Sequence, residues 1–129
     1  MEDTDGSNSA ESTSGPRDLR LRTREFSVRI IRLCESLPRY STARTIGNQL
    51  LRCGTSVGAH VAESSRAKSR ADFTCKIDGA MQELEETVYW LQLLIDSRKI
   101  PGTRLRPLLD ESSELMAIFV AMVKKTCDK

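Results

Sequence analysis

Four stretches of the chain carry apolar residues at intervals of three and four positions, which places them on one face of an α-helix. The pattern predicts helices over residues 18–36, from Ser41 or Thr42 to residue 65, from just after Ser69 to just before Pro101, and from about Thr103 onward. No segment alternates as a strand does. Because the connections are short, neighbouring helices should be antiparallel. The sequence therefore predicts an all-α fold, an antiparallel up-down-up-down four-helix bundle.

The apolar stripes also predict the core. In chain order the predicted core residues are Phe26, Ile30, Leu33 and Leu37; Ile46, Leu50, Cys53, Val57 and Val61; Phe73, Ile77, Ala80, Leu84, Val88, Leu91 and Ile95; and Leu105, Leu108, Leu115, Phe119 and Met122.

Local signals mark the helix ends. Pro38 ends the first helix, because a proline disfavours helix in the residue before it. The run Ser69-Arg-Ala-Asp72 is a variant of the capping box, and Pro101-Gly102 is a strong turn signal. Pro107 is compatible with a helix only in the first turn, where its missing N–H loses little.

Gly47, Gly54 and Gly58 lie beside the apolar stripe of the second helix. Each glycine costs a helix roughly 1 kcal/mol relative to alanine. Close approach of a neighbouring backbone would offset that cost. One interpretation is that this side of the helix packs against another subunit or a partner, so that Gly58→Leu would disturb assembly.

Composition supports one globular domain preceded by a tail. Of the 129 residues, 39% are hydrophobic and 29% are charged, values typical of folded proteins. Residues 1–16 are rich in Ser and Gly, carry four acidic residues and lack Lys and Arg, so we predict a disordered tail. Since the whole chain has a net charge of +2 and the tail contributes −4, the bundle domain, residues 17–127, is basic at +6. A basic body is compatible with nucleic-acid binding.

The remaining composition points to a cytoplasmic protein that binds no membrane. The apolar runs fall far short of the roughly 18 residues that span a bilayer, and the N-terminus does not resemble a signal peptide. The four cysteines, Cys34, Cys53, Cys75 and Cys127, form no CxxC pair. We interpret them as reduced thiols.

Catalytic patterns are missing from the sequence. There is no phosphate-binding loop, dinucleotide fingerprint or nucleophile elbow. The single histidine, His60, precedes Glu63 instead of following a glutamate by three residues, as a di-metal bundle requires. Cys53 would lie about 10 Å from it along a helix, too far for a Cys–His pair. We predict that the chain is not an enzyme and uses no metal or cofactor.

Basic residues offer candidates for phosphate contact. Arg66, Lys68 and Arg70 cluster at the turn before the third helix, whose N-terminus favours anions. A solvated basic loop is the alternative. The other candidates are Arg39, Arg44 and the first-helix arginines, namely Arg20, Arg22, Arg24, Arg29 and Arg32. The few aromatic residues mostly occupy core positions, which disfavours a stacking platform for single strands.

A polar row should flank the apolar seam between the second and third helices. Gln49, Arg52, Ser56 and Glu63 fall within about 60° of one another at 100° per residue. Lys76, Glu83 and Trp90 share a face of the third helix at seven-residue spacing, with Glu86 close by. Two interpretations remain open: ion pairs between Arg52 and Glu83 or Glu86 that support the core, or a polar surface that contacts a subunit or a ligand.

These residues belong to a longer pattern that resembles a known bacterial family. The pattern comprises Arg29-Ile-Ile-Arg-Leu33, Gln49-Leu-Leu-Arg52, Gly54-Thr-Ser-Val-Gly-Ala59, Ala62-Glu63, Ala71-Asp-Phe73, Lys76 and Glu86-Thr-Val-Tyr-Trp-Leu91. It is similar to the family of four-helix-bundle proteins encoded in intervening sequences of 23S ribosomal RNA genes. More distantly, it is similar to the accessory proteins of diversity-generating retroelements.

The resemblance implies ring-like pentamers with no established enzymatic activity. The retroelement proteins bind a reverse transcriptase and nucleic acid, so a polymerase partner is also implied. The family's recurring polar and aromatic positions correspond here to Gln49, Arg52, Ser56, Glu63, Lys76, Glu83, Glu86, Tyr89 and Trp90. His60 stands where the family usually has asparagine, and an imidazole does not reproduce the amide's donor and acceptor pattern.

The leading hypothesis is a non-enzymatic, oligomeric binding module that contacts RNA or DNA through basic surface residues. The alternative is a protein-interaction or scaffold bundle that binds no nucleic acid.

Overall fold

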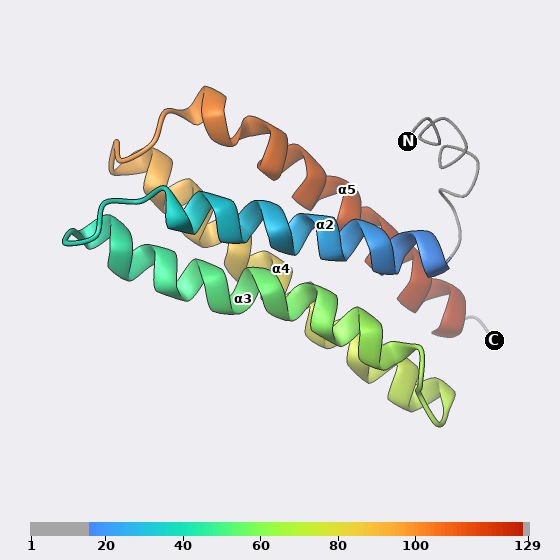
Figure 1. Cartoon of the computed structure of the whole chain (residues 1–129). Helices are drawn as coiled ribbons and strands as arrows, with labels where there is room; N and C mark the ends of the chain where they lie inside the picture. The colour runs from blue at the N-terminus through green and yellow to red at the C-terminus, as the bar shows by residue number, and fades with distance from the viewer. Residues whose placement is uncertain (1–15, 128–129) are drawn as a thin grey trace, which may run out of the picture.

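The computed structural model describes residues 16–127, which form four α-helices (Figure 1). These are α2 (Pro16–Glu35), α3 (Thr42–Ser64), α4 (Arg70–Asp96) and α5 (Gly102–Cys127). Successive helices run in opposite directions in Figure 1. The predicted antiparallel up-down-up-down bundle is therefore confirmed. The predicted disorder of the tail lies outside the described residues, except that Pro16 already belongs to α2.

The predicted stripes form the core. Phe26, Leu50, Leu84 and Phe119 have at most 1% of their surface exposed. Ile46, Phe73, Val88, Ile95 and Met122 are only partly buried and pack against this core.

Four hydroxyl residues are buried beside the apolar ones, namely Thr23, Ser64, Thr87 and Ser112. Each hydroxyl donates to a carbonyl of its own helix, at 2.6 to 3.0 Å. These bonds satisfy polar groups that would otherwise be costly to bury.

The helix ends follow the predicted caps. Ser41 precedes α3, and its Oγ accepts from the backbone N–H of Arg44. Ser69 precedes α4 and accepts from the Asp72 N–H at 3.0 Å. The Asp72 carboxylate in turn accepts from the backbone N–H of Lys68 at 3.0 Å. Side-chain acceptors of this kind satisfy N–H groups that a helix leaves unpaired in its first turn.

The prediction for Pro107 was wrong in one respect. The helix α5 begins at Gly102, so Pro107 is its sixth residue and lies beyond the first turn. Its missing N–H would have bonded to the Thr103 carbonyl four residues earlier. The helix continues through this position, at the exposed side of α5.

The three glycines of α3 face α2 of the same chain. A Cβ placed on Gly47 would lie 2.6 Å from Leu37 Cδ1, and one on Gly58 would lie 3.3 Å from the Thr23 carbonyl oxygen. The predicted close approach of a backbone is confirmed at Gly58, whereas Gly47 and Gly54 leave room for the side chains of Leu37 and Ile30. The interpretation that these glycines pack against another subunit was wrong, because α2 already occupies that side. The variant Gly58→Leu would disturb this intramolecular packing.

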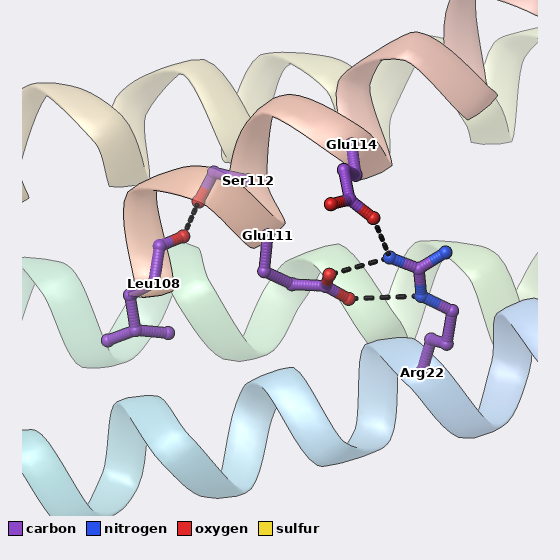
Figure 2. A network of polar contacts seen from close by, with 5 residues as sticks. All are labelled: Arg22, Leu108, Glu111, Ser112 and Glu114. Carbon is purple, nitrogen blue, oxygen red and sulfur yellow. Dashed lines mark hydrogen bonds and ion pairs between the residues drawn. The ribbon is translucent and has the colours of Figure 1, made fainter. Parts of the chain in front are cut away.

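The bundle is open along one edge. The helix α3 packs against both α2 and α4, and α4 packs against α5, but α2 and α5 make only light contact. Arg22 of α2 bridges that edge (Figure 2). Its Nε and Nη2 donate to the two carboxylate oxygens of Glu111 at 3.0 and 2.6 Å, and Nη2 also reaches Glu114 at 3.1 Å. A fork of this kind fixes the relative orientation of the two helices.

Candidate functional site

The predicted polar row follows the seam between α3 and α4. Arg52 and Ser56 of α3, together with Glu83 and Glu86 of α4, line one small pocket of about 140 Å³ with Cys53 at its base. Further along the seam, Lys76 Nζ lies 3.7 Å from a carboxylate oxygen of Glu63. The antiparallel packing brings the early part of α3 beside the late part of α4. The structure thus joins side chains that are up to about 35 residues apart in the sequence.

Of the two interpretations of this row, the ion-pair version was wrong for Arg52. Within residues 16–127, Arg52 forms no ion pair with Glu83 or Glu86, although all three line the pocket. Glu86 instead accepts from Trp90 Nε1 at 3.1 Å. The Arg52 side chain is exposed, so its guanidinium can meet an incoming group.

The base of the pocket is a protonated thiol. Burial raises the pKa of Cys53, the Glu86 and Glu83 charges raise it further, and the contact with Thr87 lowers it. Cys53 Sγ lies 3.3 Å from Thr87 Oγ1. Since the thiolate is the nucleophilic form of cysteine, the raised pKa disfavours that form at Cys53.

His60 packs against α4 at the position of Gly79. A Cβ on Gly79 would lie 2.8 Å from the imidazole ring, so only glycine leaves room for the ring there. His60 Nδ1 is buried without a hydrogen-bond partner among the residues that the structure describes, and Glu63 lies 3.9 Å away. Cys53 and His60 contact α4 at Thr87 and Gly79, eight residues or about 12 Å apart along that helix.

The remaining row positions lie at the surface. Tyr89 is 58% exposed and meets the half-buried Trp90 edge to face, with ring centroids 5.0 Å apart. Gln49 is half-buried one turn before Arg52. An exposed tyrosine beside a polar pocket is the kind of surface that protein interfaces favour.

The predicted phosphate-contact residues divide between the two ends of the bundle. Arg66, Lys68 and Arg70 are exposed at the turn between α3 and α4. Arg44 lies near the other end of α3, about 30 Å away at 1.5 Å per residue. It donates to the Leu37 carbonyl at 3.1 Å and so supports the end of α2. The structure does not bring these four residues together.

A different set of arginines converges on the open edge of the bundle. Arg29 and Arg32 of α2 and Arg104 of α5 line a groove of about 350 Å³, with Leu33, Leu105, Pro107 and Leu108. Arg104 also donates to Ser36 Oγ at 3.0 Å. Arg29 and Arg32 were among the predicted first-helix arginines, but Arg104 was not. Nothing in the local pattern of α5 indicates that Arg104 faces α2.

Residues 16–127 contain neither a candidate membrane span nor a candidate metal cluster. None of these helices is long and apolar enough to cross a membrane. Across the same range, no three His, Cys, Asp or Glu side chains gather in a way that could hold a metal ion.

The fold and the seam together define a class of small four-helix bundles with polar and aromatic groups along the α3–α4 hairpin. The chain belongs to the 23S rRNA-intervening sequence protein family, whose model matches residues 18–121. It is similar to a protein of unknown function from the S23 ribosomal protein family of Bacteroides thetaiotaomicron, known from a 1.70 Å crystal structure. The two are 34% identical, with a TM-score of 0.80 over 84% of this chain and 97% of the other. Comparison with curated proteins finds no match.

Proposed function

We propose that this chain is a non-enzymatic binding module that contacts RNA or DNA phosphates with the arginine groove between α2 and α5. The observation that carries the proposal is the convergence of Arg29, Arg32 and Arg104 on one groove without an acidic residue in its lining. Among the described side chains, none of the three arginines is in an ion pair. Guanidinium groups bind phosphate oxygens through paired N–H donors.

Neighbouring residues extend the positive charge of this end. Arg98 and Lys99 lie in the turn between α4 and α5, and Arg106 is exposed near the start of α5. Summed charge of one sign attracts a polyanion before any specific contact forms. The arginine groove therefore has both local donors and a favourable surrounding field.

The test compares two triple variants with the same change in net charge. One replaces Arg29, Arg32 and Arg104 with glutamine, and the other replaces Arg66, Lys68 and Arg70. Affinity for a mixed pool of short RNA and DNA is measured by fluorescence anisotropy at several salt concentrations. Each phosphate contact contributes about 0.7 to 0.9 to the slope of log affinity against log salt. We expect the groove variant to lose about 2 to 3 of that slope and the turn variant to keep most of it.

Equal losses of salt dependence in the two triple variants would mean that only net charge determines binding. Salt-independent binding by the native chain would contradict the proposal outright. A larger loss in the turn variant would move the interface to the residues that the sequence first indicated.

A protein-interaction or scaffold function is the second candidate. The α3–α4 pocket with its exposed Arg52 and the neighbouring exposed Tyr89 favour it. Homo-oligomers, including the pentamer that the family resemblance implies, and a polymerase partner belong to this part of the proposal. Solution mass measured on the same samples separates the candidates, because a multimer that binds no nucleic acid would favour the scaffold.

A further inference from the structure

The helix α2 has a second apolar stripe on the side opposite its core residues. Leu21, Val28 and Ile31 have 49%, 42% and 37% of their surface exposed. At 100° per residue, Leu21 and Val28 lie within about 20° of each other. They point about 170° away from the buried Phe26 and Ile30. A helix with one buried face normally presents polar residues there, so this stripe is not explained by the bundle.

The second stripe forms one wall of a groove on the outer surface of α2. The groove has a volume of about 480 Å³, and apolar atoms contribute most of its exposed surface. Its residues are Leu21, Arg24, Glu25, Val28, Arg29 and Arg32. Three arginines and one glutamate give the lining a net charge of +2. Within residues 16–127, none of these arginines is in an ion pair.

We propose that this outer groove of α2 docks an acidic amphipathic helix of a partner protein. Leu21 and Val28 are seven residues, or about two helical turns, apart, so both lie on one face of α2. The lining runs from Leu21 to Arg32, about 16 Å along the axis, which suits about three turns of a partner helix. Acidic residues beside the partner's apolar stripe would meet Arg24, Arg29 and Arg32.

Charge distinguishes this occupant from a second copy that packs through the same groove, because two such grooves would bring +2 against +2, and like charges across an interface are unfavourable. A ring sets the groove against a different face of the neighbouring copy. Loss of a native multimer in Leu21→Gln/Val28→Gln, measured as solution mass, would therefore assign the groove to self-association and overturn the proposal. A lipid surface is also a poorer fit, because Glu25 borders the apolar stripe, about 40° from Leu21 at 100° per residue. Membrane-surface helices combine a wide apolar face with cations on the polar one.

The test uses the full chain and a defined probe. The probe is a labelled three-heptad peptide with leucine at the two seam positions of each heptad and glutamate at the flanking positions. A control peptide carries lysine in place of each glutamate. By fluorescence anisotropy, we expect the acidic peptide to bind the chain at least tenfold more tightly than the control peptide does. The affinity of the acidic peptide should fall as the salt concentration rises.

Paired variants locate the binding. The double variant Leu21→Gln/Val28→Gln should lower affinity for the acidic peptide about tenfold or more. The control Leu51→Gln/Val120→Gln removes two exposed apolar side chains from α3 and α5 and should leave it unchanged. Because all four residues are exposed, thermal unfolding monitored by circular dichroism should show that both variants remain folded.

Three further outcomes would overturn the proposal. The first is no binding of the acidic peptide, and the second is an equal loss of peptide affinity in the two double variants. The third is binding of the native chain to vesicles of phosphatidylserine and phosphatidylcholine that Leu21→Gln/Val28→Gln loses while it still binds the peptide. Arg29 and Arg32 also line the arginine groove, so the docking and phosphate proposals share two side chains. Their failures remain distinguishable, because Leu21→Gln/Val28→Gln keeps all the arginines and should leave nucleic-acid binding unchanged.

Discussion

The contact between α2 and α3 depends on residues without a side chain. At Gly54, an added Cβ would lie 2.9 Å from both Cγ1 and Cγ2 of Ile30. Ile30 has no exposed surface, so it cannot move into solvent to relieve the contact. The glycine therefore allows the two helices to approach closely, and this packing offsets its poor helix propensity.

Replacing Gly54 with alanine should destabilise the protein. Alanine is favoured over glycine in a helix by about 1 kcal/mol, but overpacking a core costs roughly 1 to 3 kcal/mol. We expect a net loss of about 1 kcal/mol, measured as a lower urea midpoint. Gly102→Ala is the matched control. Its Cβ would meet Ile95 at an ordinary 3.5 Å, so its stability should not fall. Equal or higher stability of Gly54→Ala would contradict the packing argument.

Cys34 connects the same two helices through its thiol. Its Sγ donates to the Gly47 carbonyl at 3.2 Å. Burial raises the pKa of Cys34 from 9.0 to about 11, although nearby Arg44 lowers it. The folded protein therefore keeps this proton in a pH range where the unfolded chain loses it.

Stability should consequently decrease in alkaline solution. The contribution of Cys34 is complete below pH 9 and is lost as the pH rises from about 9 to about 11, by up to about 1.4 kcal/mol per pH unit. The free energy of unfolding, measured by urea titration across this range, should fall more steeply for the native chain than for Cys34→Ala. Parallel pH profiles would show that other groups cause the loss.

Helix ends were the part of each element that local sequence could predict. Ser41 and Ser69 cap α3 and α4 as expected, because a capping side chain bonds to a backbone N–H only two or three residues away. The Pro107 prediction failed on the same scale. Even from the expected start at Thr103, Pro107 is the fifth residue and lies beyond a first turn of about 3.6 residues, so the error does not come from the observed start at Gly102.

Helices α2 and α5 are held together by the Arg22 fork in addition to the apolar core that both share. Since Arg22 and Glu111 are mostly shielded, with 23% and 18% of their side-chain surface exposed, their fork is worth more than an exposed ion pair. We expect Arg22→Gln to lower the free energy of unfolding by about 1 kcal/mol. The free energy of unfolding of Arg22→Lys should lie between those of the native chain and Arg22→Gln, because lysine keeps the charge but lacks the planar guanidinium with its paired donors.

The measurements are chemical denaturation and hydrogen exchange. The α5 amides near Glu111 should exchange faster in Arg22→Gln than in the native chain. Arg20→Gln removes an exposed arginine from the same helix and should change neither. A similar loss in Arg20→Gln would attribute the effect to the helix charge.

At the scale of the whole molecule, the fold was more predictable than the site. Periodicity placed residues such as Leu50 and Leu84 in the core because one helix face must be buried. It also placed Arg52 and Glu83 on faces that could meet, and the register of the α3–α4 hairpin brings them to one pocket. Arg104 could not be assigned in this way. Its position beside Arg29 and Arg32 depends on how α5 lies against α2, which no local pattern encodes.

The order of packing along the chain has a consequence for how the protein folds. Each extensive interface joins helices that follow one another in the sequence, and only the light contact of α2 with α5 joins the two ends. A topology with mostly local contacts has a low contact order and folds fast, in microseconds to milliseconds for helical bundles. Closing the α2–α5 edge requires the longest loop, so the fork between Arg22 and Glu111 should form late, after the three hairpins have already paired.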